Sequence, residues 1–518
     1  MANEPEQNGP EEATFDEFSV ESDLELEVTP AKTSKPSRNW AAQTLDALLT
    51  ELELWHSPGG APYATVQVAD HKENWPLLSE RFKSWLRYRA VDHGHPLASA
   101  ADLEKIIGSL AAVAVHRGEC HRTWTRVGEH DGKYYVDLGD AAWRCVEIHP
   151  LDRSRDSHWQ IIPKAPIKFV RRPSMRPMAE PIPGGSIDQF HRFANFETEA
   201  DVQLAIGWII ASFRPSGPYP ILIIGGTQGS GKSTLLRLLS RLVDPTFAPE
   251  RNLPKDERDL YVSATNSHLQ TFDNLSGINN GMSDALCRIA TGGGFSTRTL
   301  HTDGEEFLMQ ARKPIIINGI SDLAHRGDLI DRSLQVRAAR LSPEKRRTEE
   351  EFWNEFEAEE GMILGVLLNG VAWALGTYAK TPIPPVRMSD AGRFMEASTA
   401  FFAWAPGTFT KLLRDNRIQA NQAVIESNAF AVALVTLLDE KDGEWRGSAT
   451  ELLYAVANKA EQNVKRAKNW PATPSAASAG LDRIKDALET RGYVFERGHE
   501  GVRRERRYIQ FSRRSDGE

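Results

Sequence analysis

Cysteine is almost absent from this sequence of 518 residues, which contains only three. Cys120, Cys145 and Cys287 are odd in number and far apart, which excludes a disulfide framework or a four-cysteine zinc site. No run of about eighteen apolar residues occurs, so no membrane-spanning helix is expected. The opening stretch MANEPEQNGPEEATFDEFSVESDLELEV lacks the basic and apolar regions of a secretion signal. These absences predict a cytoplasmic protein with no membrane partner.

Outside residues 1–38, the sequence also has no strong excess of positive or negative charge. The net charge is −9, but residues 1–38 contain ten acidic side chains against Lys32, Lys35 and Arg38. This segment sums to −7 and leaves −2 for the other 480 residues, so the overall charge does not argue against nucleic-acid binding. Because residues 1–38 have few aromatics and many Glu, Pro and Ser, we predict a disordered acidic tail there.

Apolar periodicity divides the rest of the chain into four regions. Residues 39–180 mix amphipathic helices with short β-favouring runs and are predicted to form an N-terminal mixed α/β accessory domain. Residues 186–345 alternate apolar strands with helices, which favours a parallel sheet covered by helices. Residues 346–435 are predicted to be helical. In residues 440–514, helices precede a turn-linked β-ribbon, which predicts a winged-helix-like nucleic-acid-binding domain.

The strongest motif begins where the apolar run ILII meets glycines. Residues 226–233, GTQGSGKS, fit G-x-x-x-x-G-K-[ST] and precede the helical stretch TLLRLLSRLV. Such a loop directs consecutive backbone N–H groups at phosphate oxygens, beside the partial positive charge of a helix N-terminus. The residues predicted to bind ATP are Gly226, Thr227, Gln228, Gly229, Ser230, Gly231, Lys232, Ser233 and Thr234. Lys232 is expected to meet the β- and γ-phosphates and Ser233 to coordinate Mg²⁺; a glycine-rich turn without a ligand is the alternative.

Two later strands end in polar side chains that suit the same chemistry. Asp273 follows the β-favouring run HLQTF and is predicted to be the second Mg²⁺ ligand. Position 274 is Asn, where many such ATPases carry a Glu that orients the attacking water. Asn318 ends the run PIIIN and could contact the γ-phosphate or that water. A simple turn-forming role is the alternative for Asp273 and for Asn318.

Arg332 completes the predicted catalytic set of Lys232, Asp273, Asn318 and Arg332. It ends a short helical segment just before a further strand, DRSLQVRA. An arginine there can reach the nucleotide of a neighbouring subunit and stabilise charge that develops on the phosphoryl group. Arg326 is the alternative candidate for this role, and a solvated surface arginine is the other explanation.

Two groups of basic residues are predicted to contact nucleic acid. Between Asp273 and Asn318, two short strands flank Thr302-Asp303-Gly304-Glu305 and predict an inserted hairpin. Its cationic candidates for phosphate contact are Arg298, His301 and Lys313. The second group lies in the C-terminal ribbon and comprises Arg503, Arg504, Arg506 and Arg507, with Tyr508 close by. A surface hairpin with an acidic tip and a solvated basic terminus are the alternatives.

Taken in this order, these motifs resemble a known motor. The stretches GGTQGSGKST, FDNLS, LCRIATGGGFSTRTLHTDGEEF, KPIIINGISDL and DLIDRSL resemble the core of superfamily 3 helicases within the AAA+ ATPases. The resemblance is greatest to the primase-associated helicases of phages, plasmids and integrated elements. It implies a P-loop α/β core in a ring, commonly a hexamer, with ATP and Mg²⁺ at subunit junctions and DNA held by hairpins in the pore. No primase active site is evident upstream, and the hairpin tip is acidic.

Three functions remain open from sequence. The first is an ATP-dependent DNA helicase or translocase that acts on single strands or forks in the replication of a mobile element, together with a primase or other replication proteins. The second is a slow or non-hydrolysing ATP-gated DNA-binding switch or assembly factor, which Asn274 favours. The third is a small-molecule P-loop kinase, which leaves the hairpin and Asn318 unexplained.

Overall fold

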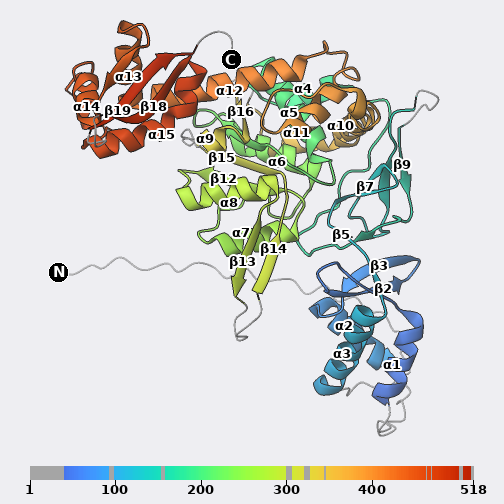
Figure 1. The fold of residues 1–518 in the computed structure, drawn as a ribbon. Coiled ribbons are helices and arrows are strands. Elements are labelled where there is room, and N and C mark those ends of the chain that lie inside the picture. The colour runs from blue at the N-terminus through green and yellow to red at the C-terminus, as the bar shows by residue number, and fades with distance from the viewer. Residues whose placement is uncertain are drawn as a thin grey trace, which may run out of the picture.

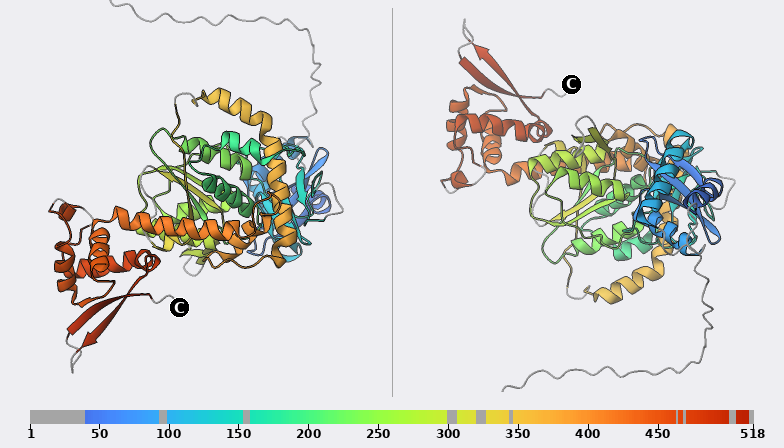
Figure 2. Two further views of the ribbon diagram at one scale, coloured as in Figure 1. Left: turned by 90° about the horizontal axis from the view of Figure 1, so that it is seen from above. Right: turned by 90° about the horizontal axis from the view of Figure 1, so that it is seen from below.

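An N-terminal unit and a C-terminal unit lie on opposite sides of a central body (Figure 1), and two further views show the same separation (Figure 2). The structure is a computed structural model that describes residues 40–92, 99–152, 158–298, 306–319, 327–342, 346–462, 464–467, 470–500 and 506–514. The acidic tail predicted for residues 1–38 lies outside the described residues, as do His301, Arg326, Arg503 and Arg504.

The N-terminal unit is a small α/β module with its own hydrophobic core. It consists of α1 (Trp40–Glu51), β1 (Glu53–His56), β2 (Pro62–Val68), β3 (His71–Pro76), α2 (Glu80–Asp92), α3 (Ala100–His116) and β4 (Glu119–Cys120). The sheet has the order β3-β2-β1-β4, antiparallel except for the β1–β4 pair. Leu48, Val66, Phe82 and Leu110 bring the three helices and the sheet together in one buried cluster.

Two further sheets connect this unit to the central body. Their strands are β5 (Thr123–Trp124), β6 (Val127–His130), β7 (Lys133–Asp137), β8 (Cys145–Ile148), β9 (Trp159–Ile162) and β10 (Lys168–Phe169). Strands β6 to β9 form an antiparallel meander, and β5 pairs with β10. Val136, Val146 and Ile148 belong to the same buried cluster as the central body. The accessory region predicted at residues 39–180 therefore comprises two units with separate cores.

Arg126 fastens this meander to the central body. Its side chain is fully buried, and its Nε donates to Oδ1 of Asp244 over 2.8 Å. Its terminal nitrogens donate to the backbone carbonyls of Asp137 and Arg176 over 2.8 and 2.9 Å. A buried charge is tolerated only when it is paired and hydrogen-bonded, and both conditions hold here.

The central body is built on a four-stranded parallel sheet, as the sequence predicts for residues 186–345. Its elements are α4 (Ile187–Phe193), α5 (Glu199–Ser212), β11 (Ile221–Gly225), α6 (Lys232–Val243), α7 (Glu257–Asn266), β12 (Gln270–Leu275), α8 (Asn280–Thr291), β13 (Gly294–Arg298), β14 (Glu306–Gln310), β15 (Ile315–Gly319), α9 (Gly327–Ile330) and β16 (Ser333–Arg337). The strand order is β12-β15-β11-β16. Residues 221–224 and 315–319 are buried throughout, as expected for strands covered on both faces. The inserted hairpin β13–β14 is antiparallel.

A long helix covers the central body. α10 (Glu349–Thr377) starts with a capping box between Thr348 and Glu351 and contacts α4, α5 and α11 (Ser389–Ser398), with the turn η2 (Tyr378–Lys380) at its end. In length and apolar composition it qualifies as a candidate membrane span, but more than half of its apolar window is buried inside the protein. Phe356, Ile363 and Leu367 lie in the main core, so the helix has the burial of a core helix.

The C-terminal unit follows α12 (Thr408–Ser427). It contains α13 (Ala429–Glu440), β17 (Trp445–Gly447), α14 (Ala449–Ala457), η3 (Val464–Arg466), α15 (Pro474–Thr490), β18 (Tyr493–Glu500) and β19 (Arg506–Arg513). The antiparallel sheet has the order β17-β19-β18. Leu452, Leu481, Tyr493 and Phe511 pack the helices on this sheet, which gives helices followed by a ribbon, in the predicted order.

Candidate functional site

The loop between β11 and α6 has the shape of a phosphate cradle. Gly226, Gly229 and Gly231 have φ values of 142°, 76° and 80°, a region that other residues rarely adopt. A Cβ on Gly226 would lie 2.8 Å from Oγ of Ser230 and 3.0 Å from the carbonyl oxygen of Ala338. Helix α6 begins at Lys232, so its unpaired N–H groups and partial positive charge face the loop. This end of α6 suits an anion.

Lys232 bridges the loop from inside. Its Nζ donates to the carbonyl oxygens of Gly226 and Thr227 over 2.9 and 2.8 Å. Partial burial lowers the pKa of Lys232, and the negative charge of Asp273 opposes this shift. The ammonium is thus held by neutral carbonyls, which a phosphate oxygen can replace.

Ser233, Asp273 and Asn318 form one hydrogen-bonded group. Oγ of Ser233 donates to Oδ1 of Asp273 over 2.9 Å, and Nδ2 of Asn318 donates to the same oxygen over 2.6 Å. Strand β15 lies between β11 and β12, so the buried Asn318 stands between the P-loop strand and the strand of Asp273. The structure brings these sequence-predicted residues together at the carboxyl edge of the sheet.

This oxygen-rich group fits a magnesium ion that shares its coordination with phosphate. Mg²⁺ prefers oxygen ligands and usually keeps waters and substrate phosphates beside one or two protein groups. Ser233 and Asp273 supply a hydroxyl and a carboxylate 2.9 Å apart. Within the described part of the chain, no group of three or more His, Cys, Asp or Glu side chains could hold a metal ion unaided.

Asn274 sits in a local irregularity of β12. The pairing of β12 with β15 shifts between Phe272 and Leu275, and Asn274 has a φ of 54°. Its backbone N–H donates to Oδ1 of Asn318 over 2.6 Å, and its side chain is exposed. Asn tolerates the left-handed region far better than Glu does, which gives a conformational reason for the departure at this position.

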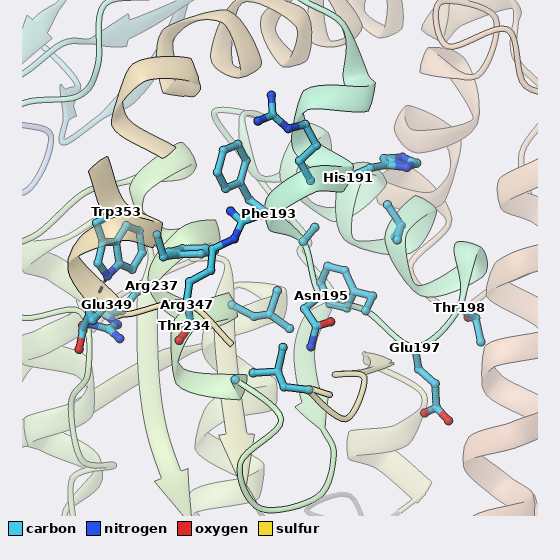
Figure 3. Close-up of a pocket in the computed structure, with 18 of the residues that line it drawn as sticks. His191, Phe193, Asn195, Glu197, Thr198, Thr234, Arg237, Arg347, Glu349 and Trp353 are labelled. Carbon is cyan, nitrogen blue, oxygen red and sulfur yellow. Dashed lines mark hydrogen bonds and ion pairs between the residues drawn. The ribbon is translucent and has the colours of Figure 1, made fainter. Parts of the chain in front are cut away.

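A cavity of about 660 Å³ adjoins the P-loop (Figure 3). It lies between the α4–α5 connection, the first turns of α6 and the start of α10. The labelled lining residues are His191, Phe193, Asn195, Glu197, Thr198, Thr234, Arg237, Arg347, Glu349 and Trp353. Nδ2 of Asn195 donates to the carbonyl oxygens of Ser230 and Ala339, which ties the cavity wall to the loop. Sequence reasoning missed this cavity because its walls come from segments far from the motif and carry no motif of their own.

Arg332 lies at the opposite, amino edge of the sheet. Ser333 is in register with Ile221, the first residue of β11, whereas the P-loop follows the last. Nη1 of Arg332 binds Oδ1 of Asp328 and donates to the carbonyl oxygen of Asp328 over 3.0 Å. Burial and the nearby Arg387 lower the pKa of Arg332. Arg332 and the P-loop of its own chain therefore lie at opposite edges of the sheet.

The predicted nucleic-acid residues are only partly brought together. Arg298 ends β13, and Arg506 and Arg507 begin β19, where both are exposed. Lys313 lies after the hairpin, at the amino end of β15, where its backbone N–H donates to the carbonyl of Ile289. Burial lowers the pKa of Lys313 to about 8. Its role as a phosphate contact stays a prediction that no contact in the structure supports.

Comparison with known families assigns most of the chain. Residues 187–404 match the family described as actinomycete integrative conjugative element replication protein. Residues 430–517 match the RepA C-terminal domain of the same elements. These two matches cover most of the central body and the C-terminal unit, so these parts of the chain are similar to the replication proteins of such elements. The resemblance to replication proteins of integrated elements, which the sequence predicts, is confirmed by these matches.

Two solved structures align with most of this chain at low sequence identity. One is described as "SCCmec type IV Cch - active helicase", is 12% identical, and aligns over 89% of this chain and 93% of its own with a TM-score of 0.45. The other is described as the A form apo structure of the NrS-1 C-terminal region, is 12% identical, and aligns over 92% and 98% with a TM-score of 0.39. No curated protein matches.

Proposed function

We propose that this replication protein is an ATP-driven DNA helicase or translocase that works as a ring in the replication of its conjugative element. The observation that carries the proposal is the hydrogen-bonded group of Ser233, Asp273 and Asn318 next to a glycine loop in left-handed conformation. These residues approach from three strand ends at one edge of a parallel sheet, the edge at which open α/β sheets bind ligands.

The nucleotide is assigned to the loop and the adjoining cavity. The backbone N–H groups of residues 226–234 would cradle the phosphates, Lys232 would exchange two carbonyl partners for phosphate oxygens, and Ser233 with Asp273 would hold Mg²⁺. Thr234, which follows Ser233, lines the 660 Å³ cavity, so the base and ribose would lie between Phe193 and Trp353. Bound Mg²⁺-ATP supplies the phosphoryl bond whose hydrolysis drives movement.

The roles of the chain's own residues follow from their positions. Asn318 orients the Asp273 carboxylate through a 2.6 Å hydrogen bond and also holds the backbone at Asn274. Arg332, at the opposite sheet edge, would act on the nucleotide of a neighbouring copy, which is why the proposal requires a ring.

The C-terminal unit is proposed to be a winged helix that contacts the DNA backbone. Three helices and a three-stranded antiparallel sheet in the order β17-β19-β18 support this assignment. Arg506 and Arg507 stand at the start of β19, next to the ribbon tip, where exposed cations suit phosphate contacts that do not depend on base sequence. The hairpin β13–β14 is proposed as the second DNA contact, inside the ring.

Asp273→Asn provides the test. The change keeps size and hydrogen bonding but removes the negative charge that Mg²⁺ requires, so DNA-stimulated ATP turnover and fork unwinding should both fall about 100-fold. Asp259→Asn, an exposed carboxyl on α7, is the matched control and should leave both rates unchanged.

A second candidate is an ATP-gated DNA-binding switch, which the exposed Asn274 at the usual Glu position favours. Wild-type protein that binds ATP tightly but neither hydrolyses it with DNA present nor separates a fork would establish the switch in place of the helicase.

A further inference from the structure

The segment that carries Arg332 contacts two helices: α12, which leads to the C-terminal unit, and α15, which belongs to that unit. Residues 327–335 include α9, Arg332 and the start of β16, and α9 contacts both α12 and α15. The approach is close, because a Cβ on Gly327 would lie 2.2 Å from Oδ2 of Asp486 on α15. α12 runs from the central body into the C-terminal unit (Figure 2).

Two consecutive residues of α12 bracket Arg332. Nε of Arg417 lies 2.8 Å from Oδ1 of Asp331, the residue before Arg332. Asn416 is buried, and its side-chain amide both donates to the carbonyl oxygen of Gln335 over 2.6 Å and accepts the N–H of Gln335 over 2.9 Å. This paired hydrogen bond fixes the backbone three residues after Arg332, so the position of α12 sets the position of the arginine.

The other end of α12 is tied to α15. Nδ2 of Asn421 donates to Oγ1 of Thr490 over 2.8 Å, and the two helices pack along each other. α13 begins at Ala429, two residues after α12 ends at Ser427. Helix α15 precedes the basic ribbon β18–β19, so α12 links the unit proposed to bind DNA with the segment of Arg332.

The side chain of Arg332 belongs to a cluster of ion pairs that share their aspartates. Its side chain is only 16% exposed and binds Asp328, which also pairs with Arg387 over 3.4 Å. Arg387 lies 3.5 Å from Asp331 as well. The ion pairs of this cluster join Arg332, Arg387 and Arg417 to Asp328 and Asp331, and the negative charge of Asp284 also acts on Arg332.

We propose that Asn416 and Arg417 are positioning residues for Arg332, through which the C-terminal unit sets ATP hydrolysis at the neighbouring subunit. DNA held by the C-terminal unit shifts α15 and α12 together, and the bonds to Asp331 and Gln335 pass that shift to the arginine. This inference rests on the proposed function, because it requires Arg332 to act on a neighbour's nucleotide.

Arg417→Ala tests the proposal against Arg414→Ala, three residues earlier on the same helix. Arg414 is 68% exposed, and within the described part of the chain its side chain pairs with the adjacent Asp415. Arg417→Ala should lower kcat for DNA-stimulated ATP turnover about 10-fold with KM unchanged, Arg417→Lys should recover most of it, and Arg414→Ala should equal wild type. Equal rates for Arg417→Ala and wild type, or an equal loss in Arg414→Ala, would overturn it.

Mixed rings separate a positioning role from a folding defect. Lys232→Ala subunits cannot use ATP but keep an intact Arg332 segment, so they should restore turnover to Arg417→Ala neighbours above the mean of the two parents. Recovery no greater than that mean overturns the inference. The proposed function fails separately if wild-type protein shows no turnover or if Arg332→Ala is as active as wild type. With wild type active and Arg332→Ala inactive, only the claim about α12 is under test.

Discussion

The charged side chains at the two edges of the central sheet differ in their hydrogen-bond and ion-pair partners. At the carboxyl edge, Lys232 donates to two neutral carbonyls, and Asp273 accepts from Ser233 and Asn318. At the amino edge, Asp244 is fully buried, pairs with Arg126, and accepts the N–H groups of His268 and Leu269.

This difference separates a site that can receive a ligand from a structural anchor. The Arg126–Asp244 pair at the amino edge is neutralised within the chain, and breaking it leaves a buried charge without a partner. Groups at the carboxyl edge keep weak, replaceable partners, so substitutions there should change chemistry more than stability.

Lys232→Ala should produce the largest effect, a loss of ATP turnover without a loss of folding stability. Removing the ammonium is expected to lower ATP turnover about 1,000-fold, or about 4 kcal/mol in the activation barrier, with the urea midpoint almost unchanged. A coupled assay of phosphate release gives the rate. Lys255→Ala, an exposed lysine ahead of α7, should retain full turnover. A large loss of stability in Lys232→Ala would erase the distinction between the edges.

Arg126→Ala should show the converse behaviour. It leaves Asp244 buried and uncompensated, which is expected to cost about 3 kcal/mol in the free energy of unfolding of the central body. Urea unfolding followed by tryptophan fluorescence measures it. Arg87→Ala on the exposed face of α2 should stay within about 0.5 kcal/mol of wild type. Equal midpoints for the two variants would show that the anchor contributes little.

His268 should make the amino edge sensitive to acid. Burial lowers the pKa of His268 to about 4, and the positive charge of Lys313 acts in the same direction. In the unfolded chain, histidine has an ordinary pKa of about 6.5. Between this value and the lower pKa of the folded state, the unfolded chain binds a proton at His268 and the folded chain does not. Lowering the pH from 7 to 5 should therefore reduce the free energy of unfolding by about 2 kcal/mol through this residue.

The matched variant for this pH dependence is His268→Gln, which can still donate to the carbonyl oxygen of Ser212. Its unfolding free energy should fall less between pH 7 and pH 5 than that of wild type, as measured by urea titrations at both values. An identical fall in both proteins would assign the acid sensitivity to other groups.

Substitutions at Asn274 should have the smallest effect on stability, and they test whether the backbone at the carboxyl edge is strained. Asn274→Ala places an ordinary residue at a φ of 54° and should cost about 1 kcal/mol. Asn274→Gly, which meets no such restriction, should stay within a few tenths of wild type. Thermal unfolding of the two variants side by side decides it; equal stabilities would mean that the bulge is not strained.

Local patterns predicted the parts of the site that lie next to strand ends. The P-loop, Asp273 and Asn318 each follow an apolar run, and parallel strands deliver their carboxyl ends to one edge, so their meeting follows from the fold class. The wall of the adjoining cavity could not be predicted in this way. Phe193 and Trp353 come from helices on either side of the motif in sequence, and neither residue carries a pattern that distinguishes it from an ordinary core aromatic.

By itself, the sequence determined the phosphate loop, the parallel sheet and the order of helices and ribbon at the C-terminus, because glycine conformation and apolar periodicity act over a few neighbouring residues. Only the tertiary structure decided that Lys313 is partly buried beside the amino edge and that Arg332 lies at the sheet edge opposite its own P-loop. It alone decided that Asn416 and Arg417 hold the segment of Arg332. These outcomes depend on which distant segments pack together, and burial and pairing of charges are set by that packing.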